Sequence, residues 1–364
     1  MKKQETNQII AESPKTNHLT IFIHGTILPL RFPQNIKEIV NDIKKPSLKK
    51  AYQNYLDNLR INSSFRKQPI GPRGLFKVDL SSNQEKLISF SSKIIISAYK
   101  ETELQINPNV ENSFYLFGWN GNLKHKDRVQ AAFKLYKDLQ DEIENIKKTS
   151  DLPIKITLLA HSHGGNVALN LELAEIEFKK NLEIDELILL GTPIQKETKN
   201  FASSPIFKKI YNIYSRGDAM QTIDILSTRG FKSKRRFELP DPKYKIKEIE
   251  IKVENKKPVH CELWFTGNFP LFRKNLPLYP FPIVVFAPMI VKLTNETSSS
   301  APNSQNFLIK IIKKTSEITL LISNKEKTFF KKNVLGESKL ENIDYLEDLF
   351  CKFQKKQSKT TYTP

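Results

Sequence analysis

Cysteine is scarce in this chain of 364 residues: only Cys261 and Cys351 occur, and they lie far apart in the sequence. Two such residues exclude the disulfide framework that stabilises small secreted domains, and they fit a reducing compartment. Because 39% of the residues are hydrophobic, the chain can build a sizeable core without such cross-links. We expect one large domain, with room for a smaller satellite.

Long apolar runs are also lacking. The chain begins with two lysines that no apolar stretch follows, which argues against a secretory signal. The longest uncharged run, residues 275–291, contains four prolines and is shorter than the ~20 apolar residues of a membrane-spanning helix. This run is typical of a buried extended segment, and a lip that touches a membrane is the alternative. We expect a cytoplasmic protein.

Arginine is rare among the basic residues, since the net charge of +19 comes with 48 lysines and only 10 arginines. Proteins that read nucleic acids rely on Arg for bidentate and stacking contacts, and the sequence contains no helix-turn-helix or aromatic RNA-binding motif. The lysines are scattered, as on a solvated surface. We therefore expect no specific nucleic-acid partner, and weak association with an anionic membrane is the remaining alternative.

Strand-like and helix-like patterns alternate along the chain. Strand patterns occupy residues 19–23, 113–117, 154–160, 186–190, 209–214, 246–253 and 307–323. Helix patterns occupy residues 36–60, 84–101, 126–148, 165–179 and 338–356. The charged alternation in residues 246–253 indicates a strand near a sheet edge. Together the patterns predict an α/β fold with a mostly parallel sheet and helices on both faces.

The composition divides the chain into four parts. Residues 1–18 form an N-terminal tail, and residues 19–293 form the main α/β domain. Residues 294–306 are polar and are predicted to be a linker. Residues 307–364 would then be a C-terminal extension of unknown role.

The most distinctive motif is the stretch Ala160-His161-Ser162-His163-Gly164, between a strand pattern and a helix pattern. Small-x-Ser-x-small at such a turn is typical of a nucleophile elbow, whose strained backbone presents the serine hydroxyl. The flanking residues must be small because strand and helix backbones pass close together. The helix start also directs N–H groups at the site.

A serine nucleophile needs a base and a carboxylate that orients the base. The chain contains six histidines: His18, His24, His125, His161, His163 and His260. Only His260 follows both the serine and a later strand, so it is the candidate base. Asp218, after the strand pattern 209–214, is the first candidate acid. Asp224 is the second, and Asp241 lies in a proline-flanked turn.

Acyl transfer also needs backbone N–H groups that stabilise the negative charge on the carbonyl oxygen. The N–H of His163, directly after the serine, is one candidate donor. The loop His24-Gly25-Thr26, after the strand 19–23, can supply the second, because Gly25 permits close approach of the backbone. We predict the Thr26 N–H as this donor, with Ile27 as the alternative.

The two histidines beside the serine have a metal-binding alternative, because His-x-His at a strand end begins many zinc sites. A binuclear site would need a nearby aspartate, and the sequence has Gly164 and Gly165 there. It also contains no Cys-x-x-Cys or His-Glu-x-x-His motif. We predict that His161 and His163 pack around the elbow, and that the protein needs neither a metal nor an organic cofactor.

The segments IFIHGT, LLAHSHGGNVAL, LLGTPI, YSRGDAMQ and VHCELW, in this order, resemble the α/β-hydrolase superfamily, in particular its lipase-like serine esterases. The resemblance covers about residues 19–265 and implies an α/β-hydrolase fold with an eight-stranded sheet and a triad of Ser162, Asp218 and His260. The segment FGWNGN, with Arg128 after it, also resembles this family. Trp119 in that segment would line an acyl pocket or pack in the core.

The resemblance implies a serine hydrolase that cleaves carboxylic esters, including lipid esters, through an acyl-enzyme on Ser162. A thioesterase, an acyltransferase and a non-catalytic interaction protein on the same fold are the alternatives. The short segment between the strands 186–190 and 209–214 leaves no room for a large lid. We therefore predict that residues 28–112 form a helical insertion that caps the site.

Overall fold

A computed structural model describes part of the chain. The described residues are 16–27, 67–81, 87–222, 233–238, 245–266, 278, 281–300, 305–313, 318–323 and 329–333. Within them, one ten-stranded sheet has the order β10-β9-β8-β7-β6-β5-β4-β1-β3-β2. The strands are β1 (Asn17–Ile23), β2 (Gly74–Val78), β3 (Glu111–Gly118), β4 (Ile154–His161), β5 (Ile184–Leu190), β6 (Phe207–Tyr214), β7 (Ile246–Val253), β8 (Asn306–Lys313), β9 (Ile318–Ser323) and β10 (Phe329–Asn333).

The sheet is mostly parallel, as the sequence predicts. All neighbours from β3 to β8 pair in parallel. The pairs β2–β3, β8–β9 and β9–β10 are antiparallel. The α/β class is therefore confirmed, although the sheet has ten strands instead of the eight that the resemblance implies.

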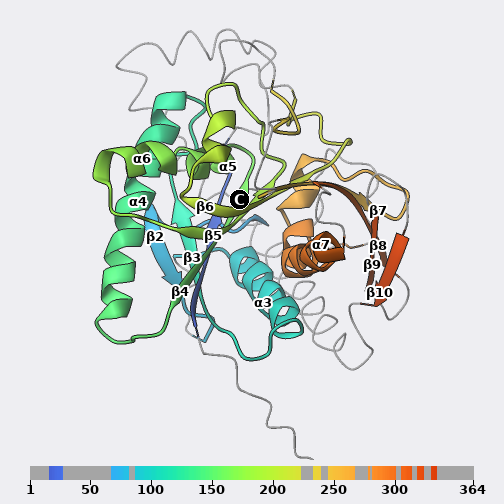
Figure 1. Cartoon of the computed structure of the whole chain (residues 1–364), viewed down its shortest axis with the longest axis horizontal. Coiled ribbons are helices and arrows are strands. Elements are labelled where there is room, and N and C mark those ends of the chain that lie inside the picture. The colour runs from blue at the N-terminus through green and yellow to red at the C-terminus, as the bar shows by residue number, and fades with distance from the viewer. Residues whose placement is uncertain are drawn as a thin grey trace, which may run out of the picture.

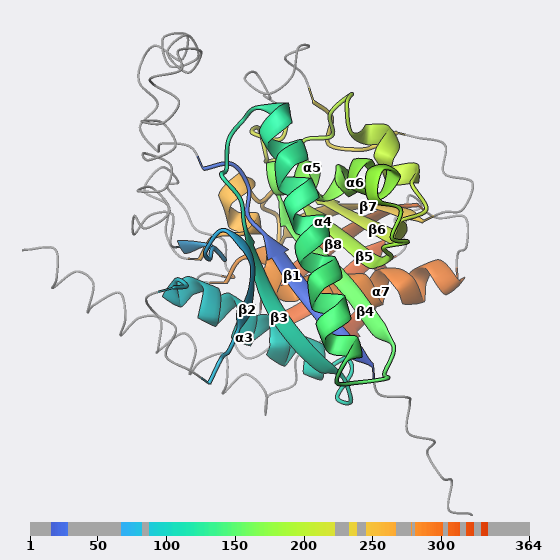
Figure 2. The same cartoon turned by 90° about the vertical axis from the view of Figure 1, so that its left-hand side faces the viewer.

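Helices cover both faces of the sheet (Figure 1). One face carries α4 (His125–Lys147), α5 (His163–Leu169) and α6 (Leu171–Phe178), and the other carries α3 (Phe90–Leu104) and α7 (Ala287–Ser300). Figure 2 shows α4 lying along β1, β3 and β4. Successive strand residues serve opposite faces: Ile21 packs in the core under α4, and Phe22 packs in the core with α3.

Helix α4 shows how the sequence pattern produces this layering. Its buried residues recur at helical spacing and form one stripe against the sheet: Arg128, Ala131, Ala132, Leu135, Tyr136 and Leu139. Asp127 in the first turn and Lys147 in the last turn suit the helix dipole. The predicted helix 126–148 is thus found almost residue for residue.

The charged alternation of residues 246–253 indicated a strand near a sheet edge, but β7 is an internal strand between β6 and β8. Ile249 and Ile251 pack in the core with α7. On the opposite face, Glu248 accepts a hydrogen bond from Asn212 and Glu250 binds Arg216. The alternation therefore reports one apolar and one polar face of an internal strand.

The predicted linker 294–306 is also wrong, because residues 294–300 continue helix α7. Their polar side chains bond to the helix itself: Thr294 and Thr297 donate to carbonyls four residues earlier. Strand β8 then pairs with β7, and Ile309 is fully buried. The described residues beyond 305 extend the main sheet and do not form a separate unit.

The insertion 28–112 is described only from residue 67 onward. There β2 forms the sheet edge and α3 packs on the sheet through Ile94 and Ile95. This described part belongs to the main fold, so the predicted cap is wrong for it. The tail 1–15 and the predicted helices 36–60 and 338–356 lie outside the described residues.

The uncharged run 275–291 is buried where it is described, as predicted, but residues 283–291 are helical and not extended. It contains the 3-10 turn η4 (Ile283–Phe286) and the start of α7. The side chains of Ile283 and Val284 are fully buried, so they offer no apolar surface to a membrane. Within the described part of the chain, no helix is both long and apolar enough to cross a bilayer.

Candidate functional site

The strand order places a topological switch point between β1 and β4. From β1 the chain crosses to β3 on one side and then returns to β4 on the other. Ligands of open α/β sheets bind at such a switch point, outside the carboxyl ends of the strands. The chain leaves β1 through His24 and Gly25, and it leaves β4 through Ser162.

Ser162 has the strained backbone of an elbow. It follows β4 directly and precedes the first residue of α5, with φ 52° and ψ −129°. A non-glycine residue adopts this conformation only when its surroundings impose it. Two hydrogen bonds hold it: Ser162 N–H donates to Leu190 O over 3.0 Å, and Gly165 N–H donates to Ser162 O over 3.0 Å.

Glycines allow three segments to converge on this turn. A Cβ on Gly25 would lie 2.8 Å from Ser162 Cβ, so the loop after β1 touches the serine. A Cβ on Gly164 would lie 2.5 Å from His24 O, and one on Gly165 would overlap the Thr192 side chain. The close approach at Gly164 is thus made to the end of β1 and not, as we expected, to the serine's own strand.

Asp218 and His260 lie next to each other, although they are 42 positions apart. His260 Nδ1 is 2.7 Å from Asp218 Oδ2; Asp218 is fully buried and the His260 side chain is 15% exposed. The other carboxylate oxygen, Oδ1, accepts the Gln221 N–H over 3.0 Å. The alternative acids Asp224 and Asp241 lie outside the described residues.

Contacts through His161 and Gly191 bring this pair against the elbow. The rings of His161 and His260 are 4.5 Å apart between centroids, and His161 Nε2 is 3.2 Å from His260 O. A Cβ on Gly191 would lie 2.8 Å from Asp218 Oδ2 and 3.3 Å from His260 Nδ1. Between the described residues Ser162 and His260 no hydrogen bond is formed; such bonds often tighten only when substrate binds.

Burial sets the protonation of two neighbours of His260. Desolvation, with a contribution from His260, holds the pKa of His161 well below its usual range, so this ring stays neutral. It stacks on Trp264 with ring centroids 5.5 Å apart. Burial raises the pKa of the Cys261 thiol to about 12, so this thiol does not compete as a nucleophile near neutral pH.

The loop after β1 offers Thr26 as an oxyanion donor. The Ile27 N–H donates to Gly121 O over 3.0 Å, which argues against the alternative donor Ile27. The Thr26 hydroxyl is buried without a hydrogen-bond partner in the described part of the chain. His163 is the first residue of α5, and its ring nitrogen Nδ1 lies 3.4 Å from the Asn166 amide.

Trp119 packs against the same loop. It is 3% exposed, and its indole N–H donates to His24 O over 2.7 Å. Its backbone N–H donates to His24 Nε2, and the two rings stack at 5.7 Å. Trp119 is therefore a core aromatic that supports the loop, which leaves the acyl-pocket alternative without support. Arg128 is likewise fully buried, and it donates to Gln195 Oε1 over 3.0 Å.

Two supporting residues escaped the sequence reasoning. The Gln221 side chain donates to Thr192 O over 2.8 Å, which ties the Asp218 loop to the loop after β5. The Arg235 guanidinium donates to Asp218 O over 2.8 Å. Gln221 lies in the segment YSRGDAMQ, so the sequence could have indicated its role. Arg235 lies outside every motif recognised in the sequence, so nothing there indicated it.

Metal binding has no support in this geometry. Among the described residues, no three His, Cys, Asp or Glu side chains are arranged to hold a metal ion. The rings of His161 and His163 serve different neighbours, His260 and Asn166.

A scan against protein-family models and a search of the curated proteins both found no match.

Proposed function

We propose that this protein is a serine hydrolase with an α/β-hydrolase fold, which cleaves carboxylic esters through an acyl-enzyme on Ser162. One observation carries the proposal: a buried aspartate bonds a histidine ring at 2.7 Å, and that ring contacts His161, the residue before a serine in a strained strand-to-helix turn. This is the combination that nucleophilic catalysis by serine requires. The position of this turn at the sheet's switch point is a further support.

In the proposed mechanism, His260 accepts the proton of Ser162 as its oxygen attacks the ester carbonyl. Asp218 holds the His260 ring through Nδ1 and stabilises the imidazolium cation. The N–H groups of Thr26 and His163 stabilise the oxyanion. His260 then protonates the leaving alcohol, and a water molecule activated by His260 releases the acid and regenerates the serine.

The neutral state of His161 suits this mechanism. His161 lies against the His260 ring, so a charge on it would oppose formation of the His260 cation. Because burial keeps the His161 pKa low, His260 carries the only positive charge of this ring pair during the reaction. An uncharged, stacked neighbour can fix the orientation of the base without this electrostatic penalty.

For the substrate we propose esters with an apolar acyl chain, including lipid esters. A series of p-nitrophenyl esters, from acetyl to decanoyl, tests both parts of the proposal. We expect kcat/KM to rise with chain length, because each buried CH₂ adds about 0.8 kcal/mol. Loss of turnover in Ser162→Ala, with normal turnover in Ser203→Ala on the exposed surface, is the expected control.

Two results would contradict these proposals separately. Turnover that survives in Ser162→Ala would reject Ser162 as the nucleophile. Turnover that depends on Ser162 but falls from acetyl to decanoyl would keep the hydrolase and reject the apolar acyl chain.

A further inference from the structure

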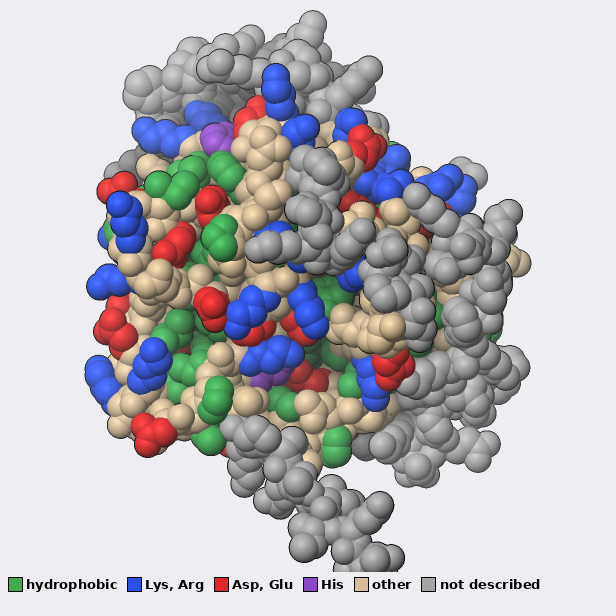
Figure 3. Space-filling view, in the orientation of Figure 1, with side chains coloured by type: hydrophobic (Ala, Val, Ile, Leu, Met, Phe, Trp, Pro, Cys, Tyr) green, Lys and Arg blue, Asp and Glu red, His purple; other side chains and the backbone are tan. Residues whose placement is uncertain are grey.

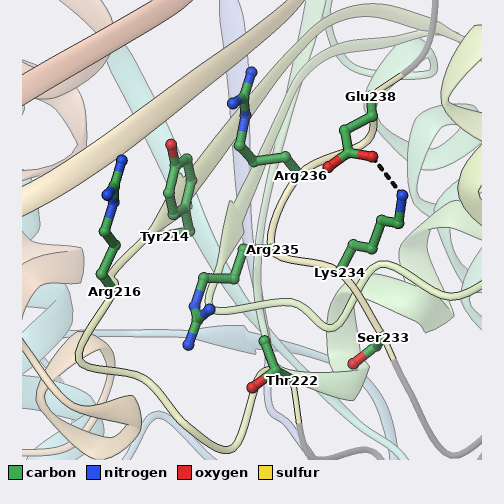
Figure 4. Close-up of a pocket in the computed structure, with 8 residues that line it drawn as sticks. All are labelled: Tyr214, Arg216, Thr222, Ser233, Lys234, Arg235, Arg236 and Glu238. Carbon is green, nitrogen blue, oxygen red and sulfur yellow. Dashed lines mark hydrogen bonds and ion pairs between the residues drawn. The ribbon is translucent and has the colours of Figure 1, made fainter.

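A cavity of about 450 Å³ lies at the carboxyl end of β6, beside the loop that carries Asp218. Figure 4 shows its lining: the side chains of Tyr214 and Arg216 come from the end of β6, and a group of basic side chains comes from the segment 233–238. These are Lys234, Arg235 and Arg236. The mechanism proposed for Ser162 uses none of these side chains directly.

The cavity has more positive than negative side chains. Lys234 pairs with Glu238, and Arg216 Nε pairs with Glu250 Oε2 at 2.9 Å. Arg235 donates to the carbonyls of Ser215 and Asp218, and Arg236 donates to the Asn306 amide oxygen. Within the described ranges, neither Arg235 nor Arg236 forms an ion pair. Glu248 and Glu238 interact with Arg236 at longer range.

The excess of positive over negative side chains is a local feature of this cavity. Elsewhere on the face shown in Figure 3, Lys and Arg side chains are interspersed with Asp and Glu. Basic side chains that gather in a hollow focus the field on one bound anion, whereas a scattered lysine surface does not. Three of the four basic side chains that line the cavity are arginines, although the chain has far fewer arginines than lysines.

Hydrogen-bond donors with spare capacity converge at one end of the cavity. Arg236 Nε is buried and has no hydrogen-bond partner among the described residues. Tyr214 is 7% exposed, and in Figure 4 its hydroxyl lies between the guanidinium groups of Arg216 and Arg236. Burial, together with Glu250 and Glu248, raises the pKa of Tyr214, and both arginines oppose this rise; the net shift is upward, so the phenol remains a neutral donor.

We propose that this cavity binds a phosphate monoester group, with Arg216, Arg236 and the Tyr214 hydroxyl as its donors. A guanidinium offers parallel N–H groups that match phosphate oxygens in a bidentate manner. A monoester presents three terminal oxygens and carries nearly two negative charges at neutral pH, which suits two arginines and one hydroxyl. The group can belong to a free anion or to a lipid headgroup such as that of phosphatidic acid.

Titration calorimetry of the full chain with inorganic phosphate tests the first source. We expect saturable binding by the wild type and at least tenfold weaker binding by the double variant Arg216→Gln/Arg236→Gln. Arg236→Lys, which keeps the charge but loses the parallel N–H groups of the guanidinium, should bind with intermediate affinity. Lys209→Gln is the matched control, since Lys209 is exposed at the opposite end of β6.

Sedimentation with vesicles tests the second source. We expect phosphatidic acid vesicles to bind the wild type more strongly than phosphatidylglycerol vesicles of equal charge, and the double variant to lose this difference. Circular dichroism melts of each variant show whether it is folded. Binding should be unchanged in Ser162→Ala, so this proposal can succeed or fail independently of the hydrolase.

Loss of binding in the folded double variant, in either assay, supports the site and identifies the source of the phosphate. Binding to neither probe would overturn the proposal. So would equal binding by the wild type and the double variant, which would reveal only attraction to the overall charge of +19.

Discussion

At the scale of single residues, Ser162 has a strained backbone conformation that its neighbours hold in place. A non-glycine residue at φ 52° and ψ −129° is strained by roughly 1–3 kcal/mol. The hydrogen bond to Leu190 O and the contact with Gly25 hold this conformation. Leu190 is the last residue of β5, and Gly25 lies in the loop after β1. The strain therefore points to a use for the side chain at this position.

The sequence allowed the three candidate catalytic residues to be placed in order, because each follows a recognisable strand. It did not reveal Arg235, whose guanidinium binds the backbone of the Asp218 loop. A contact with a backbone carbonyl leaves no mark on the sequence of the accepting residue. For the same reason the bond between Ile27 N–H and Gly121 O, which favours Thr26 as the donor, could not be foreseen.

Replacement of Asp218 with Asn should lower kcat by about 10⁴-fold, the magnitude known for the equivalent change in a serine protease triad. The amide cannot stabilise the His260 cation, and it favours the wrong tautomer of the ring. Steady-state ester hydrolysis measures this change. The control is Asp151→Asn on the exposed surface, and equal activity of both variants would exclude Asp218 from the mechanism.

Glu248 should make the stability of the protein depend on pH. Burial raises its pKa from 4.5 to about 7, so the folded state favours the protonated acid. Its stabilising contribution is complete below pH 4.5 and is lost as the pH rises through 7. Relative to wild type, Glu248→Gln should gain on the order of 3 kcal/mol between these limits. Urea unfolding at several pH values measures this gain, and parallel pH profiles would contradict it.

At the scale of elements, the types and approximate positions of the central strands and helices followed from periodicity, although the predicted helix 165–179 is two helices, α5 and α6. Which elements and side chains lie next to one another did not follow from periodicity. The polar face of β7 gives the sequence pattern of an edge strand, although the strand is internal. Its carboxylates Glu248 and Glu250 bind Asn212 and Arg216. The threonines at the end of α7 mimic a linker, because their bonds to the helix backbone are invisible in the sequence.

The junction of β1, the elbow and α5 depends on Gly164. An added Cβ would meet His24 O at 2.5 Å and Ile23 O at 2.7 Å, and backbone atoms cannot move aside cheaply. We expect Gly164→Ala to lower the free energy of unfolding by about 1–3 kcal/mol and to reduce activity.

Gly71→Ala is a suitable comparison for this prediction, because its nearest contact is the Leu116 side chain at 3.1 Å. It should cost less stability and leave activity unchanged. Urea unfolding and ester hydrolysis compare the two variants, and equal effects would show that the approach of α5 to β1 is not tight.

At the scale of the whole molecule, one sheet unites segments that the sequence analysis separated. Strand pairing joins β8 to β7 and β9 to β8, while α3 and α7 share the core beneath them. The polar stretch 294–306 suggested a domain boundary, but the pairing of β8 with β7 shows that the same sheet continues beyond it. Such pairing depends on register between distant segments, which one sequence does not display.

Ile309 in β8 therefore should report on the central core. It is fully buried in the cluster that contains Trp264, one of only two tryptophans in the chain. Ile309→Ala should cost about 2–5 kcal/mol and lower the urea midpoint seen by tryptophan fluorescence. Leu308→Ala, on the half-buried opposite face, should shift it much less. An unchanged midpoint in Ile309→Ala would mean that β8 unfolds independently of the core.

The central claim is that Ser162 is an activated nucleophile. The most direct measurement is covalent labelling of the full chain with a fluorophosphonate, followed by mapping of the modified residue by mass spectrometry. We predict one label, on Ser162, with none on Ser162→Ala and a strongly reduced labelling rate in His260→Ala, since His260 is the proposed base and its ring contacts His161, the residue before the serine. Failure of the folded wild-type protein to label, or a label on another serine, would contradict the account.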